Sequence, residues 1–265
     1  MAEVLPGIHT VDGVTLDLAG AEVHVHPVLI VEDGHLTLID AGPAGSERPI
    51  RAYVEGLGYS LRDIERIIVT HHHSDHTGAL ARLAAETDAA IAAHTAEIPI
   101  LEGRVAEPAA PLSPEGLRTM GIPITRAQYA ARIGAAFDPP AVKVAEELEG
   151  GNTLPLLGGL QVLHDTGHSP GHIALLAPAR GTLFAADLFA YDGREVLIPL
   201  PIFTQDAGQA VQTLRAIVET CDFDAAIPYH GVPLIGHAAE KLRRELSGVK
   251  VSVGHPLPGQ VLPGG

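Results

Sequence analysis

Four potential metal ligands stand close together in the run THHHSDHTG, at His71, His73, Asp75 and His76. The run follows the apolar segment 66–70, which we expect to be a strand. Because side chains alternate along an extended backbone, His71 and His73 should point to one side and reach a common ion. Asp75 and His76 come after a bend and can bind a metal at a neighbouring position. Imidazole and carboxylate groups bind zinc and related divalent metals, so the spacing predicts a metal centre.

A histidine taken alone is better explained as a hydrogen-bonded surface or core residue than as a ligand. Here the grouping outweighs that explanation, because the chain has 15 histidines, several of them clustered, among only 4% aromatic residues. Further polar residues stand in a glycine-rich turn, where one of His168 and His172 should be a ligand, and at the ends of apolar, strand-like segments, at Asp187 and His230. Their motifs are DTGHSPGH, FAAD and PYHG. These positions support the prediction of a metal centre.

The elements that carry these residues alternate between strands and helices. Asp33-Gly34 suits a tight hairpin between the first two strands of this pattern, and Ser60 with Asp63 resembles a helical capping box. Expected strands cover 28–31, 36–39, 66–70, 89–93, 160–164, 173–177, 182–187 and 225–228. Expected helices cover 46–57, 79–86, 207–219 and 236–246. This mixture predicts two packed sheets with helices outside.

The segment 98–151 differs from the rest of the chain. It holds seven prolines and no regular strand pattern, and its best helical stretch is 127–137. It is too short to bury a core of its own, so we interpret it as an inserted lid or rim that forms a wall of the substrate pocket. The chain is accordingly predicted to be one domain over 1–265 that carries this insert. An apolar lid could also provide a homodimer contact.

The charge balance argues against some partners. Asp and Glu number 32 against 17 Lys and Arg, a formal net charge of -15, which should repel nucleic acid and anionic lipid headgroups.

A single cysteine, Cys221, rules out an intrachain disulfide. The amino terminus lacks the features of a signal peptide, and no stretch approaches the roughly 18 uninterrupted apolar residues of a membrane-spanning helix. We therefore expect a cytoplasmic protein that acts on a small molecule, with neither nucleic acid nor membrane as a partner.

The order of the motifs carries a family resemblance. LIDAG ending at Gly42, THHHSDHTG, DTGHSPGH, FAAD and PYHG follow one another as in the metallo-β-lactamase superfamily, which the chain resembles over nearly its whole length. The resemblance implies an α/β fold, a four-layered αβ/βα sandwich of two facing sheets with helices outside. It also implies two metal sites. One would be formed by His71, His73 and His168 and the other by Asp75, His76 and His230, with Asp187 bridging the two ions.

Five other residues near these motifs are not expected to bind metal. His172 matches a family position that supports the loop of the preceding ligand, so it should orient its neighbours. Asp40 matches a position that is usually structural and lies near the site. His72 should point to the opposite side from its two neighbours, and nothing beyond ordinary hydrogen bonding is assigned to His94 or His164.

The implied chemistry is hydrolysis. Two divalent ions a few ångströms apart can share a bridging hydroxide, because the metal charge lowers the pKa of the parent water toward about 7. One ion can also polarise the substrate carbonyl, and Asp75 is both a metal ligand and the expected catalytic proton acceptor. Zinc suits these ligands best, although iron and manganese also fit. We predict a metal-dependent hydrolase that cleaves a small ester, lactone, thioester or amide.

Alternatives from neighbouring and different enzyme classes stay open. An N-acyl-homoserine-type lactonase would keep all seven ligands and a tyrosine shortly after the bridging aspartate, close to where Tyr191 stands. A mononuclear iron persulfide dioxygenase shares much of the motif set but would be an oxidoreductase. A non-catalytic metal-binding protein would be expected to have lost ligands, and all seven are present.

Other members of the family fit less well. A secreted β-lactamase would carry a signal peptide, and one major group would have cysteine in place of Asp187. A glyoxalase II would append a helical glutathione-binding region, whereas 35 residues follow His230. A tRNA-processing nuclease would present a basic surface, and a diiron electron-transfer relative would have glutamate in place of His73.

Overall fold

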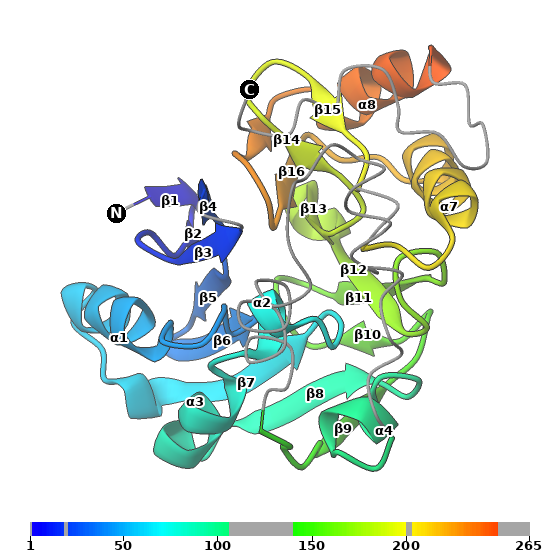
Figure 1. Cartoon of the computed structure of the whole chain (residues 1–265). Helices are drawn as coiled ribbons and strands as arrows, with labels where there is room; N and C mark the ends of the chain where they lie inside the picture. The colour runs from blue at the N-terminus through cyan, green and yellow to red at the C-terminus, as the bar shows by residue number, and fades with distance from the viewer. Residues whose placement is uncertain (1, 19–20, 106–139, 200–202, 249–265) are drawn as a thin grey trace. The chain divides into compact units, whose positions relative to one another are not determined.

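The computed structural model describes residues 2–18, 21–105, 140–199 and 203–248. The chain divides into two compact units, Met1–Glu147 and Leu148–Gly265, and each contains its own mixed sheet (Figure 1). Among the described residues, every helix is too short or too polar to cross a membrane. The expectation of one domain over 1–265 stays a prediction.

A seven-stranded sheet forms the centre of the first unit, in the order β1-β2-β5-β6-β7-β8-β9. The strands from β1 to β6 in this order pair antiparallel, whereas β6, β7 and β8 pair parallel. Parallel strands end at the same edge of a sheet, so the residues that follow β6, β7 and β8 meet at one edge. The strands are β1 (Ala2–Leu5), β2 (Ile8–Thr10), β5 (Val28–Glu32), β6 (His35–Ile39), β7 (Ile64–Val69), β8 (Ala90–His94) and β9 (Glu146–Leu148).

Strand β7 delivers the chain to the histidine run. Its sequence IERIIV ends in three residues, 67–69, that are fully buried. A continuous apolar run is typical of a parallel strand that is covered on both faces. The predicted strand over 66–70 is therefore confirmed, and so are the predicted strands over 28–31, 36–39 and 89–93.

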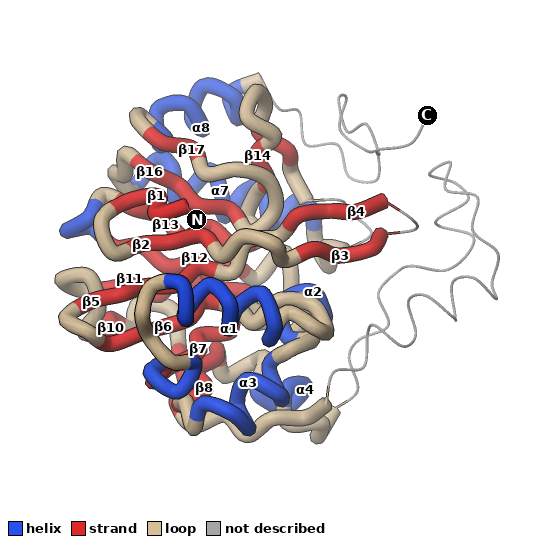
Figure 2. The backbone as a smooth tube through the Cα atoms, turned by 90° about the vertical axis from the view of Figure 1, so that its left-hand side faces the viewer, coloured by secondary structure: helices blue, strands red, loops and turns tan. Residues whose placement is uncertain are grey.

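The helices of the first unit pack through apolar positions at helical spacing. Helix α1 buries Ile50, Tyr53 and Val54, which are three and four residues apart. The capping box before η1 is confirmed, because Ser60 Oγ accepts a backbone hydrogen bond and Ser60 N–H donates to Asp63 Oδ2 across 2.7 Å. The helices are α1 (Glu47–Gly56), η1 (Leu61–Asp63), α2 (Ser74–Thr77), α3 (Leu80–Thr87) and α4 (Ile98–Leu101). A separate hairpin of β3 (Thr15–Leu18) and β4 (Ala21–His24) completes the unit (Figure 2).

A six-stranded sheet forms the centre of the second unit, in the order β10-β11-β12-β13-β16-β17. All neighbours pair antiparallel except β13 and β16, which are parallel. The residues after these two strands therefore meet at one sheet edge, as in the first unit. The strands are β10 (Thr153–Leu154), β11 (Leu160–Asp165), β12 (His172–Ala177), β13 (Thr182–Ala186), β16 (Ala225–Pro228) and β17 (Leu234–Ile235), with a small hairpin of β14 (Ala190–Tyr191) and β15 (Val196–Leu197) beside them.

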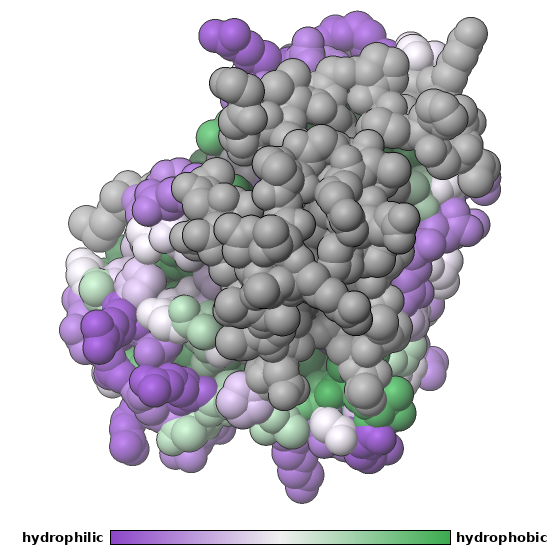
Figure 3. Space-filling view, viewed as in Figure 1, coloured by the Kyte–Doolittle hydropathy of each residue, from purple (hydrophilic) through white to green (hydrophobic). Residues whose placement is uncertain are grey.

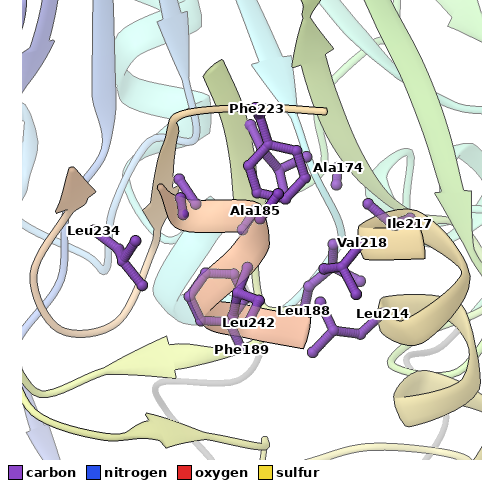
Figure 4. Packing of buried hydrophobic residues seen from close by; sticks show 14 of the residues in the cluster. Ala174, Ala185, Leu188, Phe189, Leu214, Ile217, Val218, Phe223, Leu234 and Leu242 are labelled. Carbon is purple, nitrogen blue, oxygen red and sulfur yellow. The ribbon is translucent and has the colours of Figure 1, made fainter. Parts of the chain in front are cut away.

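Helices α7 (Ala207–Thr220) and α8 (Ala238–Ser247) bury apolar side chains against this sheet. Figure 4 shows part of the resulting cluster, which includes Phe189, Leu214, Val218, Phe223 and Leu242. Each fully buried side chain of this size contributes about 1.5–3 kcal/mol relative to the exposed state. The cluster therefore anchors the loops that carry the polar residues of this unit.

An arginine from each of the helices α7 and α8 donates hydrogen bonds to carbonyl groups at the C-terminal end of the other helix. Arg215 of α7 donates to the carbonyl of Leu246 in α8 across 3.1 Å. Arg243 of α8 donates to the carbonyls of Val218 and Cys221 at the end of α7. Helix C-termini carry carbonyl groups without intrahelical partners, and a cation there also interacts favourably with the helix dipole.

The predicted insert is described only at its two ends. It begins with α4 and reaches β9, and the helix expected over 127–137 lies outside the described residues. Figure 3 shows apolar surface near α4. In this part of the chain Ile100 is half-buried and Val105 is 54% exposed. The role of the insert as a lid, pocket wall or dimer contact stays a prediction.

Candidate metal centre

The two histidines predicted to face one side do so. Nε2 of His71 lies 2.8 Å from Nδ1 of His73, and the ring of His71 is fully buried. The ring centroids of His71 and His76 are 4.1 Å apart. Three imidazoles of one unit are thus brought together directly after β7.

Asp40 fixes the orientation of His76. Its Oδ1 accepts the backbone N–H of Thr70 and its Oδ2 accepts the Thr70 hydroxyl, each across 2.8 Å. Oδ2 also lies 2.8 Å from Nδ1 of His76. A carboxylate accepts only, so Nδ1 of His76 carries the proton and the lone pair of Nε2 points to the other side of the ring. On that side, Nε2 lies 3.7 Å from Oδ2 of Asp75.

The short helix α2 supports Asp75 and His76. Thr77 donates its hydroxyl to the carbonyls of His72 and His73, each across 3.0 Å, which closes the turn between the histidine run and the helix. Gly78 follows at a close approach of two backbones, because a Cβ there would lie 2.3 Å from the backbone nitrogen of Ala44. The glycine that ends the histidine run is therefore needed for the loop directly after LIDAG to pack against this helix.

The direction of His72, expected to be opposite to that of its two neighbours, stays a prediction, but its contacts are specific. His72 is buried, and both its backbone N–H and its ring Nδ1 contact one carboxylate oxygen of Glu97. Sequence reasoning missed Glu97, for which the available signal was an acidic residue inside the apolar stretch AEIPIL. His94 and His164 have local hydrogen bonds, to the N–H of Ala96 and to a proline carbonyl.

The second unit brings two histidines close to Asp187. Oδ2 of Asp187 lies 3.4 Å from Nε2 of His168 and 3.5 Å from Nε2 of His230. Nδ1 of His168 lies 3.2 Å from the hydroxyl of Thr204, so this ring too is held through Nδ1 and presents Nε2. His168 and Asp187 are buried, whereas His230 is half-buried. Thr204 was not anticipated, since it lies 36 residues from His168.

Both ring nitrogens of His172 are engaged. Nδ1 lies 3.2 Å from the carboxylate of Asp165, and Nε2 accepts the backbone N–H of Asp187 across 3.2 Å. Burial raises the pKa of Asp165, but hydrogen bonds from His172, the Gly167 N–H and a threonine outweigh it, so the net pKa is lowered. Ala186 adopts a left-handed backbone, with φ of 46°, just before Asp187. His172 thus holds the backbone of Asp187 in place.

Tyr191 belongs to the packing beside His230. Its hydroxyl contacts Nζ of Lys241 in α8, and this Nζ also lies 4.2 Å from the centroid of the tyrosine ring. The Tyr191 N–H donates to the carbonyl of His230 across 3.3 Å, and the Tyr191 carbonyl accepts the N–H of Val232 across 2.7 Å. The backbone of Tyr191 therefore holds the loop that carries His230.

The donors of both clusters suit a transition-metal ion. Within the part of the chain that the structure describes, seven residues in these groups offer an imidazole nitrogen or a carboxylate oxygen that could hold a metal. Four lie in the first unit and three in the second: His71, His73, Asp75, His76, His168, Asp187 and His230. Histidines whose far nitrogen is hydrogen-bonded are the usual form of metal-binding histidine, and His76 and His168 have that form.

Comparison with known proteins defines the family. The model of the metallo-beta-lactamase superfamily matches residues 20–220, so the chain belongs to this superfamily. The probable metallo-hydrolase YflN of Bacillus subtilis is 26% identical over 253 residues, which cover 88% of this chain and 87% of YflN. The probable metallo-hydrolase YqjP of the same organism is 28% identical over 166 residues, and the match spans about half of YqjP, 51% of its length.

Solved structures show the same fold. A metallo-beta-lactamase family protein from Thermus thermophilus matches with a TM-score of 0.68 at 21% identity, over 92% of this chain and 78% of that chain. A mutant metallo-beta-lactamase from Cronobacter sakazakii matches with a TM-score of 0.65 at 23% identity, over 93% and 92%. The predicted α/β fold of the metallo-β-lactamase type is confirmed, and the family supports a hydrolase-type enzyme.

Proposed function

We propose that the protein is a dinuclear metal-dependent hydrolase of a small ester, lactone, thioester or amide. In this proposal one ion is held by His71, His73 and His168 and the other by Asp75, His76 and His230, with Asp187 shared between them. The observation that carries the proposal is the anchoring of His76 through Nδ1 by Asp40, which orients Nε2 for a metal beside Asp75.

The ions would supply Lewis-acid chemistry when bound, because divalent metals polarise a carbonyl group and lower the pKa of water. Asp75 is the group of this chain best placed to move a proton. Its side chain is 17% exposed while that of His76 is fully buried, so Asp75 can reach both the metal ligands and solvent. We assign to it the acceptance of the proton released by the attacking water.

The substrate class rests on the relatives. YflN and YqjP are described as probable metallo-hydrolases, which supports hydrolysis in general. A hydroxyacylglutathione hydrolase of Albidiferax ferrireducens is 38% identical over 63 residues, which are 22% of its length, so thioesters belong among the candidates. The lactonase proposal gains no support from Tyr191, since its hydroxyl contacts Lys241.

The partners and location we propose follow from composition. A formal charge of -15 favours a small-molecule substrate over nucleic acid or a membrane surface. A single cysteine is compatible with the cytoplasm. Zinc is the metal we propose, with iron or manganese as the alternatives that the same ligands accept.

Elemental analysis of the purified protein, combined with a panel of lactones, thioesters and phosphodiesters, tests the proposal. We expect two ions per chain, mainly zinc, and hydrolysis of at least one lactone or thioester that stops when a chelator removes the metal. His35→Ala is a matched control, because this exposed histidine stands at the start of β6 and should change neither readout. One iron per chain with oxygen consumption on a persulfide substrate would replace the hydrolase by a dioxygenase.

A further inference from the structure

Glu97 is a fully buried carboxylate that the proposed chemistry does not use. It follows β8, three residues after His94. One of its oxygens, Oε2, accepts the backbone N–H of His72 across 3.0 Å. The same oxygen contacts Nδ1 of the His72 ring. Glu97 thus interacts with the residue between two proposed metal ligands.

The position of Glu97 does not explain its burial. It stands at the N-cap of α4, a helix that the structure describes in full. Its side chain makes no capping hydrogen bond to this helix. A carboxylate removed from water costs several kcal/mol unless hydrogen bonds or an opposite charge offset the loss. The carboxylate is directed instead at His72, where two donors converge on one oxygen.

This contact fixes the backbone between His71 and His73. The N–H of His72 is held by Glu97, and its carbonyl accepts the hydroxyl of Thr77 across 3.0 Å. Because the peptide groups on both sides of His72 are held, the side chains of His71 and His73 stay on one side of the backbone. There Nε2 of His71 lies 2.8 Å from Nδ1 of His73. The His72 ring also lies edge-on to that of His73, with centroids 5.0 Å apart.

We propose that Glu97 is a positioning residue for the metal-binding pair His71 and His73, acting through the backbone and ring of His72. This inference rests on the proposed function, because it takes the pair to be metal ligands. Supporting groups of this kind change metal affinity without touching the ion, typically by about 10–100-fold when they are removed.

The test compares zinc affinity, by competition with a chromophoric chelator, in the wild type and in Glu97→Ala, Glu97→Gln and Ile98→Ala. Glu97→Ala should weaken zinc binding by about 10–100-fold. Glu97→Gln should recover part of this loss, because an amide oxygen can still accept the His72 N–H. Ile98→Ala is the matched control: it removes a buried side chain from the same turn but keeps the carboxylate that contacts His72, and it should leave zinc affinity within about threefold.

The outcomes separate this inference from the proposed function. If the wild type binds no metal, the proposed function fails and this inference fails with it. If the wild type binds two ions and a folded Glu97→Ala binds them equally well, the positioning role alone is wrong. If Ile98→Ala loses as much zinc affinity as Glu97→Ala, the role of Glu97 is only to stabilise α4, and the inference is also overturned. Should Glu97→Ala not fold, the cobalt-loaded Glu97→Gln protein decides: an absorption spectrum identical to the wild type contradicts the proposal, and shifted d–d bands support it.

Discussion

The carboxylate of Asp40 accepts a hydrogen bond from Nδ1 of His76 across 2.8 Å, although 36 residues separate the two in the chain. Asp40 directly follows β6, and His76 lies in the short helix after β7, the parallel neighbour of β6. Asp40 itself has a left-handed backbone, with φ of 61°, which turns its side chain toward Thr70 and His76. The topology of the sheet therefore determines the orientation of a proposed metal ligand.

Asp40→Asn should weaken zinc binding by about tenfold or more, because an amide replaces one of the two oxygens that accept from Thr70 and His76. Chelator competition measures this change. Asp33→Asn is the control, since Asp33 also has a positive φ, of 53°, but is exposed in a hairpin turn. Unchanged affinity in a folded Asp40→Asn protein would mean that the ring of His76 needs no carboxylate partner.

His73→Ala and Asp75→Ala each remove one proposed ligand, and both should reduce the metal content below two ions per chain. Hydrolysis of lactone or thioester substrates should fall to the background rate, whereas the far-UV circular dichroism should stay close to that of the wild type. Neither side chain belongs to the apolar core, so the loss should be one of metal rather than of fold. Full activity in either variant would contradict the ligand assignment.

Local sequence patterns predicted the parts of the fold that depend on a few neighbouring residues. The apolar run before His71, the capping box at Ser60 and the hairpin at Asp33 are of this kind, and each is present. The grouping of His71 with His73 followed from the alternation of side chains in extended backbone.

The contacts that orient the proposed ligands could not be predicted in the same way. Glu97 reaches His72 over 25 residues, and Thr204 reaches His168 over 36. Such contacts depend on which strand ends share a sheet edge and on the direction of individual side chains, and neither is encoded in a local period. Tyr191 shows the converse, because its place in the sequence suggested chemistry and its contacts are with Lys241 and the backbone around His230.

Asp165→Asn should destabilise the protein by about 2 kcal/mol near neutral pH, since it removes the charged acceptor of the His172 hydrogen bond. The pKa of Asp165 is lower in the folded state than in the unfolded state. Its stabilising contribution is therefore complete above the ordinary carboxyl pKa and is lost as the pH falls through the lowered one. Urea unfolding from pH 7 down to pH 3, a range set by the ordinary carboxyl pKa of about 3.9, should show the two proteins converging.

The exposed Asp222 provides the comparison for this experiment, and Asp222→Asn should change the free energy of unfolding by less than about 0.5 kcal/mol at every pH. If the free energy of unfolding differs between Asp165→Asn and the wild type by the same amount at every pH, the charge of Asp165 contributes nothing and only its shape matters.

Gly231→Ala should both destabilise the second unit and disturb the loop of His230. The backbone of Gly231 has φ of 93°, and a Cβ there would lie 2.0 Å from the carbonyl oxygen of Tyr191. Gly193→Ala separates the two effects, because φ is 94° at that glycine and the nearest atom to a Cβ is 3.7 Å away. The control should lose about 1 kcal/mol of unfolding free energy from backbone strain alone, and Gly231→Ala at least about 2 kcal/mol more from the clash.

Urea unfolding measures both losses, and elemental analysis should find fewer than two ions per chain in Gly231→Ala only. Equal losses in the two variants, with full metal content, would show that the loop yields to the added methyl group and that the close backbone approach does not hold His230.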